Sequence, residues 1–303
     1  MQPLTEEKII AYLARIPPAV RDEPMAKRTS FRVGGAARLH VTAPSSEALV
    51  DAVTAALDLD VPFYVYGGGS NLLVNDDGFE GVMIQAGNRG LSFDGEKVRA
   101  ESGIITGFVA RQSVDHGLTG FEWAIGVPGT IGGAVYGNAG CYGGEMKDVV
   151  ESVDVFDLNT RERKTLSNGE CGFGYRESMF KHHPFLLLST TIQLKPTKDI
   201  VAGKTRMEEI MKMRKEKQPL ELSSCGCAFK NPPGASAGQL IDGLSLKGTR
   251  IGDIQVSEKH GNFFVNRGHA RAQDVIALIS LVKMKVRDEL GIELEEEVQL
   301  VGF

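Results

Sequence analysis

Two glycine-rich stretches decide the fold of this chain: Tyr66-Gly67-Gly68-Gly69-Ser70-Asn71-Leu72-Leu73-Val74 and Gly126-Val127-Pro128-Gly129-Thr130-Ile131-Gly132-Gly133-Ala134-Val135-Tyr136-Gly137-Asn138-Ala139-Gly140. Glycine has no Cβ and adopts positive φ readily, so consecutive glycines let backbone N–H groups converge on an anion such as a pyrophosphate. Neither stretch has the P-loop pattern or a clean Gly-x-Gly-x-x-Gly between a strand and a helix. One such cluster is typical of a structural turn, but two of them, each after an apolar segment, predict a phosphate cradle of another kind.

Length and composition bound the class of protein. The chain has 303 residues, of which 42% are hydrophobic and 24% charged, so we expect a globular protein with more than one domain. The net charge of −5 argues against general nucleic-acid binding. No run of 18 apolar residues and no signal-peptide pattern are present, which predicts a cytoplasmic protein without membrane association.

The four cysteines are Cys141, Cys171, Cys225 and Cys227. They are too few for a disulfide framework and fit a reducing compartment. The sequence Cys225-Gly226-Cys227 invites a zinc interpretation, but the usual spacing is Cys-x2-Cys, and no second pair lies nearby. We therefore expect no metal site.

The apolar patterns predict an α+β protein. Ser45–Leu57 is typical of a capped amphipathic helix that leads into a strand at 61–65, as in a βαβ unit. The polar stretch 195–199 indicates a domain junction. The other expected helices cover 5–15, 105–116, 208–217, 237–243 and 272–290, and the other expected strands cover 82–85, 98–101, 153–158, 186–194, 262–266 and 297–301.

Several collinear motifs give the chain a resemblance to a known family. Besides the glycine stretches, they are Thr29-Ser30-Phe31-Arg32-Val33-Gly34-Gly35, Phe173-Gly174-Tyr175-Arg176-Glu177-Ser178, Cys225-Gly226-Cys227-Ala228-Phe229-Lys230-Asn231-Pro232 and Ser257-Glu258-Lys259-His260-Gly261-Asn262-Phe263-Phe264-Val265-Asn266. Together they resemble the UDP-N-acetylenolpyruvoylglucosamine reductase family, in its short, type II form, over nearly the whole chain.

This resemblance implies an FAD-binding fold of the vanillyl-alcohol oxidase (PCMH) type. Residues 1–30 would form an N-terminal helix and lead-in. Residues 31–197 would bind FAD in two subdomains, about 31–82 and 83–197, and an α+β domain over 201–303 would bind substrate. The cofactor-binding residues that it implies are Tyr66, Gly67, Gly68, Gly69, Ser70, Asn71, Leu72, Gly126, Pro128, Gly129, Thr130, Gly132, Gly133, Asn138, Gly140 and Arg214.

The resemblance also implies a reaction of peptidoglycan synthesis, with a role in cell shape and division. NADPH would reduce FAD, and the enolpyruvyl ether of UDP-N-acetylglucosamine would then accept a hydride at its methylene carbon, giving UDP-N-acetylmuramate. The enzyme would be a monomer.

The catalytic residues that the family implies are Arg176, Cys227 and Glu297. An arginine is always charged and suits a carboxylate on which charge develops. Glu297 would meet the enolate as an acid, and alternation would place Glu295 on the same side and Glu296 on the other. The register of these three glutamates is open, and an acidic surface run is the alternative.

Cys227 stands where most members of this family have a proton-donating serine. A thiol releases its proton more readily than a hydroxyl, and we expect a nearby Arg176 to lower the pKa of this thiol. The alternatives are a structural cysteine, or proton donation by Ser223, Ser224 or water.

The substrate-binding residues implied are Tyr175, Lys217 and Asn231. Arg214 lies one helical turn before Lys217, so both side chains are expected to face phosphates.

Two other interpretations stay open at this point: another FAD-dependent oxidoreductase of the same fold, and a non-catalytic paralogue that binds flavin or a sugar nucleotide. Noncovalent FAD is favoured because neither glycine stretch contains histidine, with Cys141 as the alternative attachment point.

Overall fold

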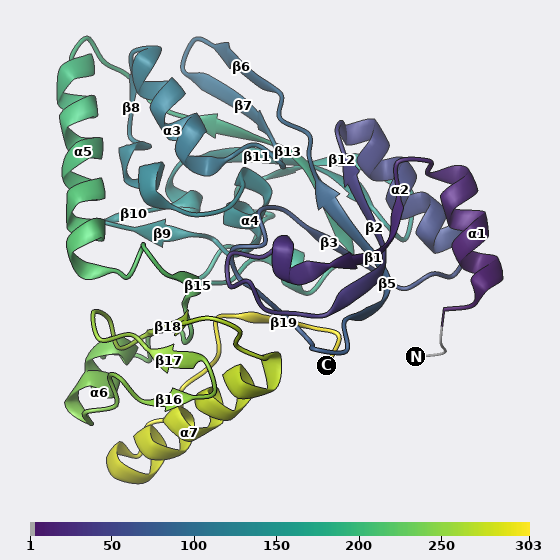
Figure 1. Ribbon diagram of the computed structural model, residues 1–303. Helices are drawn as coiled ribbons and strands as arrows, with labels where there is room; N and C mark the ends of the chain where they lie inside the picture. Colours follow the sequence, from purple (N-terminus) through teal and green to yellow (C-terminus); the bar gives the residue numbers. More distant parts are fainter. Residues whose placement is uncertain (1–3) are drawn as a thin grey trace.

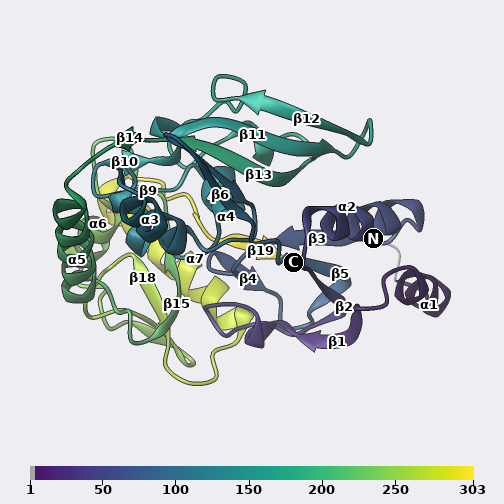
Figure 2. The ribbon, with the colours of Figure 1, turned by 90° about the horizontal axis from the view of Figure 1, so that it is seen from above.

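The computed structural model describes residues 4–303, so residues 1–3 of the expected lead-in lie outside the described part. The first unit is a four-stranded sheet of order β1-β2-β5-β3, in which β2 and β3 run parallel to β5. Helices α1 and α2 lie together beside this sheet (Figure 2). The elements are α1 (Glu6–Arg15), β1 (Val20–Pro24), β2 (Ala36–Ala43), α2 (Ser46–Asp58), β3 (Phe63–Tyr66) and β5 (Phe79–Ala86).

The cap predicted at the start of the second helix is confirmed at Ser45, and Thr5, expected inside the first helix, caps it in the same way. The Thr5 and Ser45 hydroxyls accept hydrogen bonds from the backbone N–H groups of Lys8 and Ala48, and so cap α1 and α2. Helix α2 buries Leu49 and Val53 in the core that it shares with the sheet. The expected βαβ opening is confirmed by β2, α2 and β3.

The second unit is an antiparallel sheet of order β12-β11-β13-β7-β6. Its core also includes short helices and turns that follow β7 in the chain. The elements are β6 (Leu91–Asp94), β7 (Lys97–Glu101), α3 (Thr106–Asp115), β8 (Leu118–Thr119), the 3-10 helix η2 (Glu122–Gly126), α4 (Ile131–Tyr136), β9 (Gly140–Cys141), β10 (Gly144–Glu145), η3 (Met146–Asp148), β11 (Val150–Asp157), β12 (Glu162–Ser167), η4 (Met179–Lys181), β13 (Phe185–Gln193) and β14 (Lys195–Pro196).

The third unit, drawn in green and yellow in Figure 1, is a small antiparallel sheet of order β15-β18-β17-β16 with its own apolar core. Helices α6 and α7 have the bounds that the sequence predicts, while β15 was not predicted. The elements are β15 (Ser223–Cys227), α6 (Ala237–Gly243), β16 (Arg250–Ile251), β17 (Ile254–Val256), β18 (Phe263–Asn266) and α7 (Ala272–Leu290).

The C-terminal segment joins the third unit to the first. Strand β19 (Gln299–Val301) runs parallel to β4 (Leu72–Val74), the strand that follows the first glycine stretch. On the other side of this junction, the Asp76 carboxylate accepts hydrogen bonds from the backbone N–H groups of Ala272 and Gln273 at the start of α7. The chain end is thereby held against the first glycine stretch.

Helix α5 (Ile200–Lys217) begins earlier than the helix expected at 208–217, and Asp199 caps it. It packs against α3 and η2 of the second unit, along one side of the molecule (Figure 1). The domain limits expected around residues 197–201 therefore stay a prediction, because the helix after the proposed junction still contacts the unit before it. Within residues 4–303, no helix combines the length and apolar character needed to cross a bilayer.

Candidate active site and cofactor cradle

The two glycine stretches meet in the structure. A Cβ atom at Gly67 would lie 2.1 Å from the Thr130 side-chain oxygen, and one at Gly68 would lie 3.0 Å from the Gly129 Cα. Gly129 has a φ of +95°, and a Cβ there would lie 2.6 Å from the Ser70 hydroxyl. Such approaches and such a backbone conformation require glycine. The loop between β3 and β4 and the loop before α4 therefore form one backbone-lined wall, as a cradle for an anion needs.

Thr130 gives this wall a free polar group. Its side-chain oxygen is buried and has no hydrogen-bond partner among residues 4–303, although Thr130 is the N-cap of α4. A buried hydroxyl without a partner costs free energy unless a ligand or water satisfies it. The phosphate groups of FAD fit this position, because they would accept from the hydroxyl and from the surrounding N–H groups.

Other side chains expected at the cofactor point elsewhere. The Tyr66 hydroxyl lies 2.8 Å from His40 Nε2 inside the first unit. Asn71 Nδ2 donates to the Glu297 carbonyl at 2.9 Å. Asn138 is fully buried, and its amide bonds to the Glu145 carboxylate, the Gly174 carbonyl and a backbone N–H. The contacts of Tyr66, Asn71 and Asn138 with FAD stay predictions. In the structure their side chains form hydrogen bonds within the protein, which hold the loops around the cradle.

Arg176 sits in a tight turn with a left-handed backbone conformation. Gly174 and Glu177 exchange both backbone hydrogen bonds across this turn, and Arg176 has a φ of +54°. For a residue other than glycine, this backbone conformation costs about 1 kcal/mol of free energy. The guanidinium is thereby aimed inward: its Nη2 donates to the Gly140 carbonyl at 3.1 Å, and its Nε lies 2.8 Å from Glu297 Oε1.

The Arg176–Glu297 contact is an ion pair rather than a well-aligned hydrogen bond. The Arg176 and Glu297 side chains are 23% and 22% exposed. The Arg176 Nε–H is not aligned with the carboxylate, so Nε is a buried donor without a hydrogen-bond partner in residues 4–303. Burial raises the pKa of the Glu297 carboxyl, against the opposing effect of Arg176. The pair therefore combines a fixed cation with a carboxyl that is more easily protonated than usual.

The three consecutive glutamates have different partners. Glu295 pairs with Lys230, Glu296 lies 2.8 Å from Lys283 on α7, and only Glu297 reaches Arg176. The regular strand begins later than expected, at Gln299. The alternation predicted for the three side chains nevertheless holds, since Glu296 faces α7, away from the other two.

Cys227 lies next to Glu297. It ends β15, and the Glu297 backbone N–H donates to the carbonyl of the following residue, Ala228, at 2.8 Å. Arg176 acts on the pKa of this thiol in the expected direction, but the expected net lowering was wrong: the pKa is raised from 9.0 to about 12. Burial is the largest cause and Glu297 adds to it, while Arg176 and Arg214 oppose them only in part. The thiol is therefore protonated at physiological pH.

The basic residues at the end of α5 differ in their surroundings. Arg214 is only 9% exposed, and a Cβ at Gly126 would lie 2.3 Å from its Cδ, so this glycine makes room for the arginine. Arg214 also affects the pKa values of Cys141 and Cys227, which places its charge beside the cluster. Lys217, one turn later, is exposed. Arg214 is thus a buried cation beside the cluster, and its contact with FAD stays a prediction.

Tyr175 and Asn231 connect the second and third units. The Tyr175 hydroxyl accepts a hydrogen bond from the Asn231 backbone N–H at 3.1 Å, and the Tyr175 side chain is half-exposed. Asn231 Oδ1 accepts from the Ala237 N–H at the start of α6. Cys141 donates its thiol to the Trp123 carbonyl, and burial raises its pKa, which makes it a weak nucleophile for flavin attachment.

Sequence reasoning missed two lysines of this cluster. Lys181 donates to the Arg176 carbonyl, and Lys230 pairs with Glu295. Both lower the pKa of Glu297. Lys181 follows the Phe173–Ser178 motif by three residues, and Lys230 lies inside the Cys225–Pro232 motif. Their positions in or beside these motifs are the sequence signal that could have identified both lysines.

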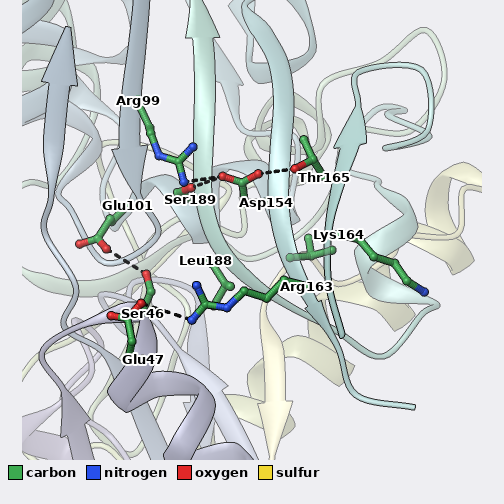
Figure 3. Close-up of a pocket in the computed structure, with 11 residues that line it drawn as sticks. Ser46, Glu47, Arg99, Glu101, Asp154, Arg163, Lys164, Thr165, Leu188 and Ser189 are labelled. Carbon is green, nitrogen blue, oxygen red and sulfur yellow. Dashed lines mark hydrogen bonds and ion pairs between the residues drawn. The ribbon is translucent and has the colours of Figure 1, made fainter. Parts of the chain in front are cut away.

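A separate cavity of about 370 Å³ lies between the start of α2 and the second sheet (Figure 3). Both arginines on its wall are paired: Arg99 lies 2.6 Å from Asp154, and Arg163 lies 3.3 Å from Glu47. It shares no residue with the cluster of Arg176, Cys227 and Glu297. Because these charges neutralise one another, the cavity does not indicate a ligand, and the cluster stays the candidate active site.

Comparison with known proteins identifies the family and the fold. Residues 37–165 match the family model described as FAD binding domain, so the fold is that of a flavoprotein. Residues 218–301 match the model described as UDP-N-acetylenolpyruvoylglucosamine reductase, C-terminal domain. The chain belongs to the UDP-N-acetylenolpyruvoylglucosamine reductase family. The fold class expected from the sequence is thereby confirmed.

The relatives cover nearly the whole chain. The UDP-N-acetylenolpyruvoylglucosamine reductase of Caldanaerobacter subterraneus subsp. tengcongensis is 42% identical, over 93% of this chain and 93% of its own length. That of Clostridium kluyveri is 41% identical, over 93% and 92%. The crystal structure of the Thermus caldophilus enzyme matches with a TM-score of 0.78 at 37% identity, over 93% of this chain and 98% of that chain.

Proposed function

We propose that this protein reduces the enolpyruvyl ether of UDP-N-acetylglucosamine to UDP-N-acetylmuramate, with FAD as cofactor and NADPH as electron donor. Family membership supports the reaction. The observation that carries it is the convergence of Arg176, Cys227 and Glu297, from three separate segments, beside the glycine cradle.

The cradle suits FAD. Gly67, Gly68 and Gly129 let the two loops approach each other closely, and the Thr130 hydroxyl, which has no partner within residues 4–303, offers a hydrogen-bond donor to a phosphate. Arg214 would place a positive charge near the bound cofactor. When bound, FAD supplies the hydride that the methylene carbon of the enolpyruvyl group accepts.

Each residue of the cluster has a role that its surroundings favour. Arg176 would hold the substrate carboxylate as negative charge develops beside it, since its guanidinium is a fixed cation whose side chain stays 23% exposed. Glu297, with its raised pKa, would donate a hydrogen bond to the enolate. Cys227, protonated at neutral pH, would give its proton to the enolate carbon and regain one from solvent.

Tyr175, Lys217 and Asn231 are proposed to bind the sugar nucleotide. The Tyr175–Asn231 hydrogen bond supports this, because it closes the second unit onto the third beside the cluster. Lys217, at the exposed end of α5, would attract the diphosphate. We further propose a cytoplasmic monomer that serves cell-wall synthesis, and thereby cell shape and division.

An anaerobic half-reaction experiment tests the function. The purified protein is reduced with stoichiometric NADPH, UDP-N-acetylglucosamine enolpyruvate is added, and the flavin absorbance is followed. Rapid return of the oxidised band, together with UDP-N-acetylmuramate in the product mixture, is expected. Reduction without reoxidation would contradict the proposal and leave a flavoprotein with another acceptor.

A further inference from the structure

Lys181 stands out in the active-site cluster because of its partners. It ends the short helix η4, and its ammonium group donates a hydrogen bond to the Arg176 carbonyl. The ammonium also lies 5.9 Å from the centre of the Tyr136 ring. No carboxylate of residues 4–303 lies within ion-pair distance of it, unlike Lys230, which pairs with Glu295. Its charge is therefore not neutralised by a direct partner.

The position of Lys181 matters because of the backbone that it binds. Arg176 is in a left-handed conformation, which an arginine adopts only when its surroundings hold it there. The peptide carbonyl of this residue is the group that Lys181 holds. A charge-assisted hydrogen bond is among the stronger contacts available for that purpose. On the other side of the turn, the Ser178 hydroxyl donates to the Tyr136 carbonyl at 2.6 Å.

The charge of Lys181 also acts on the acid of the proposed mechanism. Burial raises the pKa of Glu297 and lowers that of Lys181, and the attraction between the two charges opposes both shifts, so the two groups influence each other. The charged and titratable groups around the pair are Arg176, Glu177, Cys225, Cys227, Lys230 and Glu295.

We propose that Lys181 is a positioning residue, which holds the turn that aims Arg176 and places a positive charge opposite Glu297. This inference rests on the roles proposed above for Arg176 and Glu297. It assigns Lys181 two separable actions: a hydrogen bond that sets geometry, and a charge that sets the ionisation of the neighbouring carboxyl.

Three substitutions separate these actions. Lys181→Met removes the hydrogen bond and the charge, Lys181→Gln removes the charge but keeps an N–H donor, and Lys181→Arg keeps both. Lys198→Met is the matched control, since Lys198 is exposed and forms no hydrogen bond or ion pair with residues 4–303. For each FAD-loaded variant, kcat and KM for the enolpyruvyl substrate are measured across pH, and thermal unfolding reports on folding.

The expected results differ between the variants. Misplacement of a substrate-binding arginine by about 1 Å can cost ~100-fold, so kcat of Lys181→Met should fall roughly 10- to 100-fold. Lys181→Gln should recover much of this loss, and Lys181→Arg should lie within a few-fold of wild type. A glutamate that loses a nearby positive charge has a higher pKa. In the profile of kcat against pH, the decline caused by ionisation of Glu297 is the pH limb that disappears in Glu297→Gln. This limb should therefore move to higher pH in the Lys181→Met and Lys181→Gln variants. It should stay in place in Lys181→Arg.

The proposal is overturned if Lys181→Met keeps kcat within twofold of wild type, or if the Gln and Met variants lose kcat equally while the limb stays in place. A purely structural lysine would lower thermal stability without moving this limb. If the limb persists in Glu297→Gln, the acid role proposed for Glu297 fails. The comparison of kcat between the Met and Gln variants still decides in that case whether Lys181 positions Arg176.

Discussion

The raised pKa of Cys227 leads to a specific prediction for the pH dependence of substrate reduction. A thiol with a pKa of 9 is ~90% deprotonated at pH 10, whereas one with a pKa of about 12 is ~1% deprotonated at that pH. A donor that must carry its proton loses activity only as pH rises through its own pKa. Proton donation by Cys227 should therefore not decline between pH 7 and pH 10.

The assay is the reoxidation of the NADPH-reduced enzyme by the enolpyruvyl substrate, followed by stopped-flow absorbance from pH 6 to pH 10.5. Wild type is compared with Cys227→Ser, which removes the thiol but keeps a hydroxyl donor, and with Cys227→Ala. General acids contribute ~10²–10⁴-fold to rate, so the alanine variant should lose that factor in reoxidation, or ~3–5 kcal/mol, with flavin reduction by NADPH unchanged.

Two results would refute this reasoning. Full reoxidation by Cys227→Ala would exclude the thiol as the proton donor. A wild-type rate that falls by half near pH 9, with no such fall in Cys227→Ser, would show that the thiol ionises near its ordinary pKa despite burial and the neighbouring Glu297. The serine comparison is needed because Glu297, as a proposed acid, and Lys181, whose pKa burial lowers, can each contribute an alkaline decline of their own, which Cys227→Ser shares with wild type.

Two further predictions concern the cradle and its link to the acid. Gly67→Ala should abolish FAD retention, measured as the flavin-to-protein absorbance ratio, because the new Cβ would lie 2.1 Å from the Thr130 side-chain oxygen. Gly169→Ala is the control, because nothing lies within 4 Å of a Cβ at that position. Equal FAD retention by both variants would contradict the close packing of Gly67 against Thr130. Asn71→Ala removes the hydrogen bond to the Glu297 carbonyl and should lower the free energy of unfolding, measured in urea, by about 1 kcal/mol. It should also reduce kcat more than FAD affinity. Lost FAD affinity with unchanged kcat would instead assign Asn71 to the cofactor.

Much of the secondary structure could be predicted from local signals. Helices α6 and α7 have the predicted bounds, and the caps at Thr5 and Ser45 act as their residue types suggest. These features depend on neighbours three or four residues apart, which the sequence displays directly. Strand β15 was missed, because Ser223–Cys227 carries no alternating apolar pattern and forms through its pairing with β18.

The sequence by itself predicted that each glycine stretch is a phosphate cradle, and the family motifs pointed to Arg176, Cys227 and Glu297. Only the tertiary structure decided how these groups behave. The pKa of Cys227 follows from burial and from the nearby Glu297 carboxyl, which a distant segment of the chain contributes. The role inferred for Lys181 likewise depends on the backbone conformation of Arg176, which no residue type specifies. Charge, burial and backbone geometry at a site are sums over neighbours that the fold brings together, so they cannot be derived from any one stretch of the chain.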